Sequence, residues 1–222
     1  MTDVPMAPPR FRAIAPKNQG AFTLIELLAV VVIIAILVGI IFAVGPKVMN
    51  AARKAQAKTT AHSLVNAIQA YHTEYGRYPM ADFKQGHDTI FGNPGGDQLY
   101  STKDIVDVLV AEDQGWNAGH KLNQKEIVFF KPKPAKPSGE TFRNGLGEDG
   151  KLYDPWGQEF LIMIDGDYDG EFAEGWFQNI FQYEDFKQEF EGVVVWSYGR
   201  DGEMGREGDR KLKGSDDVAT WR

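Results

Sequence analysis

One long apolar stretch dominates the hydrophobic pattern of the chain. From Phe22 to Gly45 the only charged residue is Glu26. As a helix this stretch would be about 36 Å long, which is enough to cross a bilayer core of about 30 Å. The pattern therefore predicts a membrane-spanning helix near the N-terminus.

An amphipathic pattern follows this stretch. Pro46 predicts a kink or a local break in the helix. Beyond it, residues that favour burial recur at helical spacing: Ala61, Leu64, Val65, Ile68, Tyr71, His72 and Tyr75. Such spacing predicts one helix face packed on a globular domain. Gly76 and Pro79 indicate that the helix ends near Tyr75.

The middle of the chain gives weaker signals. Residues 80–100 are rich in turn formers and predict a loop. Ser101 followed by Asp104 resembles a capping box and predicts the start of a short helix. Residues 131–137, KPKPAKP, predict an extended strip that stays out of a central strand and serves as a connector more often than as a recognition motif.

Strands are predicted in the last third. Residues 154–157, DPWG, predict a turn, and the segment 158–164, QEFLIMI, which is apolar from Phe160 onward, predicts a buried strand. The segment 193–198, VVVWSY, is the clearest strand pattern in the chain. We therefore expect an α+β fold in which a small antiparallel sheet lies on the long helix.

Composition narrows the function classes. The 222 residues carry a net charge of −7, which argues against nucleic acid as a ligand because phosphate binding requires a basic surface. The chain has no cysteine, so an exported domain must be stabilised by its hydrophobic core or by a metal ion and not by disulfides. It shows no nucleophile elbow, zinc-protease motif or phosphate-binding loop, and we expect no enzyme.

Charges near the N-terminus predict the orientation in a membrane. Arg10, Arg12 and Lys17 stand against Asp3 before the apolar stretch. The positive-inside rule then keeps this end cytoplasmic and places the bulk of the chain outside. Glu26 lies inside the apolar stretch, where a carboxylate needs a cationic partner.

The segment around Glu26 resembles a known signal. Two small residues, Gly20 and Ala21, precede FTLIELLAV at 22–30, whereas a secretory signal has its small residues after the apolar run. This arrangement is similar to the prepilin signal of type IV pilins and type II secretion pseudopilins. An uncleaved membrane anchor is the plain alternative.

The resemblance implies a processing site and an assembly residue. Prepilin peptidase would cut after Ala21 and leave Phe22 as a methylated N-terminus. A cut after Gly20 is the alternative register, since the family usually has Gly directly before the cut. Glu26, the fifth residue of the mature chain, would pair with the amino group of Phe22 on a neighbouring copy.

The C-terminal stretch suggests a metal site. Residues 196–221 combine acidic side chains with glycines, and Ca²⁺ takes six to eight such oxygen ligands, although acidic glycine-rich tails are often merely solvated. DPWG, then S-Y-G-x-D-G and a closing D-D-V-x-x-W, resemble the major (G-type) pseudopilin of type II secretion. That resemblance implies a calcium loop with Asp201 and Asp216 as side-chain ligands, Asp217 adjacent and the Tyr198 carbonyl contributing.

A second acidic turn offers another candidate site. Asp165, Asp167 and Asp169, with Gly170, match the first half of an EF-hand loop, but its twelfth position is Trp176 and not Glu. A plain hairpin turn explains the same residues. A second calcium ion is therefore one of two interpretations.

The resemblance implies a prepseudopilin with four parts: a leader at 1–21, a transmembrane and filament-core helix at 22–46, an amphipathic helix at 47–78 and a periplasmic head at 79–222. It implies a single-pass inner-membrane protein that polymerises into a periplasmic pseudopilus and drives protein export across the outer membrane. The implied partners are prepilin peptidase, further copies of the chain, the inner-membrane assembly platform and minor pseudopilins.

Two other functions remain open. A type IV pilin or another surface-fibre subunit has the same N-terminus and predicts surface pili. A membrane-anchored, calcium-dependent binding or enzymatic domain with a prepilin signal predicts activity without assembly.

Overall fold

The computed structural model describes residues 23–92, 100–139, 141–170, 172, 192–205 and 214–221. The chain divides into two compact units, one ending at Pro46 and one beginning at Lys47. The predicted leader and its cleavage site at Gly20, Ala21 and Phe22 lie outside the described residues.

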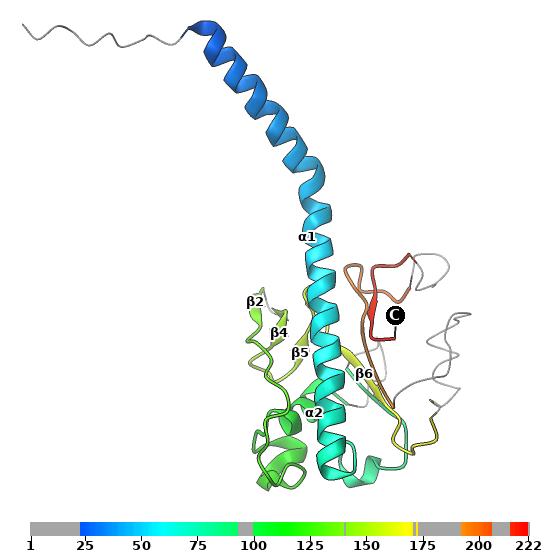
Figure 1. Ribbon diagram of the computed structural model, residues 1–222. Helices are drawn as coiled ribbons and strands as arrows, with labels where there is room; N and C mark the ends of the chain where they lie inside the picture. The colour runs from blue at the N-terminus through cyan, green and yellow to red at the C-terminus, as the bar shows by residue number, and fades with distance from the viewer. Residues whose placement is uncertain are drawn as a thin grey trace, which may run out of the picture. The chain divides into compact units, whose positions relative to one another are not determined.

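The longest element is helix α1, Leu24–Tyr75 (Figure 1). Its first part is long and apolar enough to cross a membrane, as the sequence pattern predicts, and its large side chains there are exposed. The helix continues through Pro46, so of the two predicted effects, a kink or a local break, the break does not occur. A proline removes a single N–H donor, and the helical hydrogen bonds on either side persist.

The second part of α1 forms one side of the core. Its buried side chains are Ala57, Ala61, Leu64, Ala67, Ile68 and Tyr71. The Tyr71 hydroxyl donates to the Leu122 carbonyl at 2.6 Å, and the Tyr75 hydroxyl donates to Asn123 Oδ1 at 2.8 Å. The predicted apolar face is thus confirmed, and its tyrosines pair their polar ends inside the domain.

A four-stranded antiparallel sheet packs on this helix face. Its strand order is β1-β6-β7-β8, with β1 Thr89–Phe91, β6 Leu161–Ile164, β7 Val193–Ser197 and β8 Val218–Ala219. Alternate residues such as Ile162 and Val195 face the α1 core, while Leu161 and Trp196 join a second cluster on the other face. The α+β fold with a small antiparallel sheet is as expected.

Strand β1 corrects one expectation. Residues 80–100 were predicted to be a loop, yet they contain the 3-10 turn η1, Asp82–Lys84, and the strand β1. The strand has three residues flanked by turn formers, too short to show an alternating pattern. The strand is stabilised by its pairing with β6, in which Thr89 lies opposite Ile164, and the local sequence gives no signal for that pairing.

Smaller elements complete the domain. Helix α2, Thr102–Leu109, begins at the predicted capping box, in which the Ser101 hydroxyl accepts from the Lys103 N–H at 3.2 Å and the Asp104 carboxylate accepts from the Ser101 N–H at 3.0 Å. The short 3-10 element η2, Gly115–His120, follows it. Two hairpins lie beside α1, joining β2 Lys136–Ser138 to β3 Thr141–Arg143 and β4 Gly145–Leu146 to β5 Leu152–Tyr153.

Candidate functional site

The C-terminal loop lies between the last two strands of the sheet. Strands β7 and β8 pair with Ser197 opposite Val218. Because the pairing is antiparallel, Tyr198 and Asp217 continue as neighbours just beyond the paired residues. The register therefore brings together two segments, 198–205 and 214–217, that carry the predicted ligands Tyr198, Asp201, Asp216 and Asp217. Residues 206–213 between them lie outside the described part.

Asp216 closes the turn that follows β7. Its Oδ2 accepts the backbone N–H groups of Arg200 at 2.5 Å and Asp201 at 3.2 Å. Gly199 has a φ of +75°, and a Cβ there would lie 2.6 Å from the Asp216 carbonyl oxygen. Only glycine allows this approach. The turn and the acidic segment are thus packed backbone to backbone.

Asp217 is the most buried acid of this loop, with 3% of its surface exposed. Its Oδ2 accepts from the Gly205 N–H at 2.9 Å, while Oδ1 is buried and has no hydrogen-bond partner among the described residues. Burial raises the pKa of Asp217 to about 6, and the nearby carboxylates of Asp216 and Asp201 add to the rise. An unsatisfied buried oxygen costs about 1–3 kcal/mol, which a bound cation would remove.

The donor set suits a hard cation. It consists of the Asp201, Asp216 and Asp217 carboxylates with the Tyr198 backbone carbonyl, all oxygens of the kind Ca²⁺ prefers. Asp201 is exposed, and its Oδ1 accepts from the Glu203 N–H at 3.0 Å. Within the described ranges, the three acidic side chains that bring one oxygen each within 4.8 Å of the others are a different set, outside this loop. The carboxylates of the loop are near one another, but their oxygens do not all lie within 4.8 Å of one another.

Sequence reasoning missed the residue that supports this loop. Asp154 is fully buried, and its Oδ1 accepts three backbone N–H groups, from Trp156, Gly157 and Gln158, at 2.8 to 2.9 Å. Its Oδ2 accepts from the Ser197 hydroxyl at 2.5 Å, and the same hydroxyl accepts from the Gly199 N–H at 3.1 Å. The DPWG turn is therefore bonded directly to the start of the C-terminal loop.

Two further contacts hold the end of the chain. Trp221 packs against Trp196 with ring centroids 5.9 Å apart, so the final tryptophan folds back on the sheet as the sequence suggested. Lys54 on α1 donates from Nζ to the Ser215 carbonyl at 3.0 Å. The segment that carries Asp216 and Asp217 is thus attached to both the sheet and the helix.

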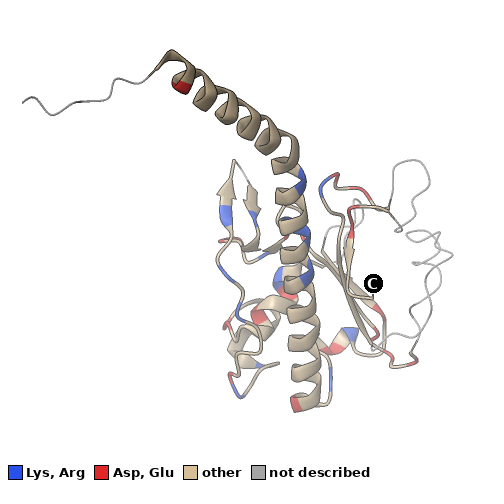
Figure 2. Cartoon of the chain, turned by 45° about the horizontal axis from the view of Figure 1, so that its top comes forward, with Lys and Arg blue, Asp and Glu red and all other residues tan. Residues whose placement is uncertain are grey.

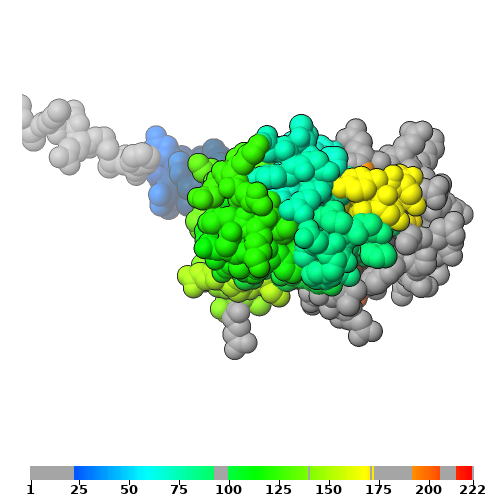
Figure 3. Space-filling model, turned by 90° about the horizontal axis from the view of Figure 1, so that it is seen from below, coloured from blue at the N-terminus to red at the C-terminus, as the bar shows by residue number. Residues whose placement is uncertain are grey.

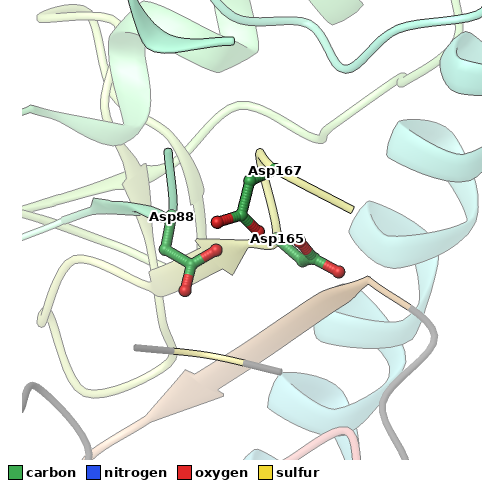
Figure 4. Close-up of side chains that lie close together, drawn as sticks. All are labelled: Asp88, Asp165 and Asp167. Carbon is green, nitrogen blue, oxygen red and sulfur yellow. The ribbon is translucent and has the colours of Figure 1, made fainter. Parts of the chain in front are cut away.

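The second candidate site is a cluster of three carboxylates (Figure 4). One oxygen from each of Asp88, Asp165 and Asp167 lies within 4.8 Å of the others. Asp165 and Asp167 belong to the predicted set, but Asp88 takes the third place where Asp169 was expected. Asp88 precedes β1 and Asp165 follows β6, so the pairing of these strands places them opposite each other. Residues 80–100 were predicted to be a loop, so the strand that positions Asp88 was not expected. No local signal could therefore identify Asp88.

The Asp165 carboxylate already organises its own turn. Its two oxygens accept from the Tyr168 N–H at 2.7 Å and the Gly170 N–H at 3.0 Å. Burial raises the pKa of Asp165, and the neighbouring Asp167 carboxylate adds to the rise. These contacts are what a hairpin turn needs, and a metal ion is not required to explain them.

Glu26 has a local partner at the start of α1. Its Oε2 accepts from both the backbone N–H and the hydroxyl of Thr23 at 2.8 Å, and the Glu26 N–H donates to the Thr23 hydroxyl at 3.3 Å. This is a reciprocal capping box, and the T-x-x-E sequence could have predicted it. In a single copy of the chain, Glu26 thus caps its own helix.

Comparison with known proteins identifies the N-terminal segment. Residues 16–42 match the prokaryotic N-terminal methylation motif. This motif indicates a type IV pilin-like or pseudopilin subunit that is processed by a prepilin peptidase and polymerises. No curated protein and no solved structure is detectably similar to the chain.

Proposed function

We propose that this pilin-like chain is a structural subunit of a type II secretion pseudopilus, whose polymerisation drives protein export across the outer membrane. The observation that carries the proposal is the buried Oδ1 of Asp217, which has no hydrogen-bond partner among the described residues, in a loop bonded through Ser197 to Asp154 of the DPWG turn. These are the segments on which the resemblance to the major pseudopilin rests.

The proposal includes a calcium ion in the C-terminal loop. Asp201, Asp216 and Asp217 would hold it with the Tyr198 carbonyl. The ion would neutralise carboxylates that now lie near one another at the edge of the sheet. Asp154 and Ser197 fix the backbone at Tyr198, and Lys54 fixes it at Ser215. The role proposed for this ion is structural, and we propose no catalytic function.

The N-terminal part of α1 would serve in both the membrane and the filament. Before assembly, it spans the inner membrane once with the head in the periplasm. In the filament, the apolar helices of several copies bundle together, and Glu26 exchanges its bond to Thr23 for the charged Phe22 amine of another copy. The assembly platform and minor pseudopilins are the further proposed partners.

The processing step offers a direct test. Expression of the full chain with an active prepilin peptidase should give a mature protein that begins at Phe22 and carries one N-methyl group, as measured by mass spectrometry. A variant with Ala21→Gly should be processed at the same bond, because Gly is the residue the family prefers there. A chain that begins at Ala21 would move the cut by one bond, and an uncleaved chain would contradict the proposal.

A further inference from the structure

Two hollows adjoin each other between the second part of α1 and the segment 130–145. Their volumes are about 470 and about 410 Å³, and Gln56 lines both. Gln56 accepts from Asn144 Nδ2 at 2.7 Å. We call them together the basic groove, because five cationic residues line it: Arg53, Lys131, Lys133, Lys136 and Arg143. Figure 2 shows Lys and Arg along α1 and on β2.

Among the residues that the structure describes, the cations of the basic groove have no acidic partner. Within the described ranges none of the five forms an ion pair, and Arg143 is bonded only to the Ser138 hydroxyl. No acidic side chain among the described residues lines either hollow. Other cations of the head are paired with carboxylates, namely Arg77, Lys103, Lys125 and Lys151. In a chain of net charge −7, this concentration of unpaired positive charge favours an acidic partner.

A surface of the opposite charge lies at the other end of the same head. Asp167 and Asp169 are exposed there, Asp88 is half-buried, and Asp165 is buried beneath them with one carboxylate oxygen within 4.8 Å of those of Asp88 and Asp167. We call these four residues the acidic end. Figure 3 looks at this end and shows the segment around 161–170 next to the segment around 76–92. Among the described residues, neither Asp165 nor Asp167 forms an ion pair.

The two surfaces are far apart along α1. Arg53 of the basic groove and His72, whose ring lies 5.6 Å from that of Tyr168 in the acidic turn, are separated by about 28 Å of helix at about 1.5 Å per residue. The two surfaces therefore cannot meet within one copy.

Assembly through parallel helices would bring the surfaces together. Copies that bundle their apolar helices in one direction are displaced along a common axis, since Glu26 of one copy would face the first mature residue of another. Over successive copies this displacement would place the far end of one head beside the Lys47 end of another.

We propose that the basic groove binds the acidic end of a second copy of this chain, as a head-to-head contact that sets the spacing of the filament. The proposal rests on the proposed function, because it uses the filament's parallel arrangement. It pairs the five groove cations of one copy with the exposed carboxylates of the acidic end of another copy. It also gives a role to the KPKPAKP segment, which supplies three of the groove cations.

The absence of cysteine makes cross-linking a clean test. Full-length chains with Lys136→Cys and with Asp167→Cys are to be made together in cells that assemble the filament, and then oxidised. The expected result is a disulfide-linked dimer that contains one copy of each variant. Gln124→Cys, at another exposed position of the head, replaces Lys136→Cys in the control and should give no such dimer. A dimer yield equal to the control would overturn the proposal.

Charge reversal separates this contact from other partners of the groove. The variant with Lys136→Glu and Arg143→Glu should lower filament yield at least about tenfold, because like charges then face each other. Adding Asp167→Lys and Asp169→Lys should restore it. Thermal unfolding of each variant shows whether the head still folds, and Lys136→Gln with Arg143→Gln provides a milder variant if it does not.

The outcomes also separate this contact from the filament itself. If wild type forms filaments and the charge-reversed variant forms them in equal yield, the groove contact is overturned. The proposed filament is not contradicted by that result. A loss that the second pair of reversals does not restore would assign the groove to another anionic partner, such as phospholipid headgroups, and would overturn the proposal. Absence of wild-type filaments would overturn both.

Discussion

Calcium is expected to raise the unfolding temperature of the full chain in detergent by roughly 5 to 10 °C at a free concentration a hundredfold above the dissociation constant. A ligand that binds only the folded state adds about 2.7 kcal/mol under that condition. For a domain of this size, each kcal/mol corresponds to about 2–4 °C. The physical source is the buried Oδ1 of Asp217, which gains a partner when the ion binds.

Two isosteric variants locate the effect. Asp217→Asn removes a charged ligand from the C-terminal loop and should abolish the calcium-dependent shift. Asp167→Asn changes the exposed member of the other carboxylate cluster in the same way and should leave the shift intact. An equal shift in Asp217→Asn and wild type would contradict the loop assignment. A shift that Asp167→Asn reduces would support the second calcium site.

The largest effect on stability is expected from Asp154→Ala. The substitution removes the acceptor of three backbone N–H groups and of the Ser197 hydroxyl. Leaving buried donors without partners costs about 1–3 kcal/mol each, and part of the turn can reach water. We therefore expect a loss of about 3–4 kcal/mol in unfolding free energy, measured by denaturant titration.

Matched substitutions define the origin of that loss. Ser197→Ala removes one of the four donors and should cost about 1 kcal/mol. Glu148→Ala changes an exposed acid of a nearby turn and should stay within about 0.5 kcal/mol of wild type. If Asp154→Ala were as stable as Glu148→Ala, the carboxylate would not organise the DPWG turn. Weakened calcium binding in Ser197→Ala would show that this turn also positions the C-terminal loop.

Local signals in the sequence were sufficient for much of the fold. The apolar run before Pro46, the spacing of Leu64, Ile68 and Tyr71, and the Ser101 capping box each depend on residues close together in the chain, and each is present in the structure. The strand at 193–197 is equally plain, because the four apolar residues from Val193 to Trp196 in succession leave few alternatives.

Contacts between distant segments were the part that sequence could not supply. Asp88 meets Asp165 through a strand pairing that spans more than seventy positions, and a three-residue strand leaves no periodic signal. Ser197 bonds to Asp154 across 43 positions of the sequence, and a serine at the end of a strand predicts no particular acceptor. By contrast, the Thr23 and Glu26 capping box lies within one turn, and its sequence could have been recognised.

The most direct measurement of the central claim is protein secretion by cells that lack this chain. If the chain is a type II pseudopilus subunit, proteins normally released into the medium should accumulate in the periplasm, while surface fibres remain. Wild-type chain should restore release, and a Glu26→Ala variant, which keeps the head intact, should not. Normal secretion together with the loss of surface fibres would contradict the claim and identify the chain as a pilus subunit.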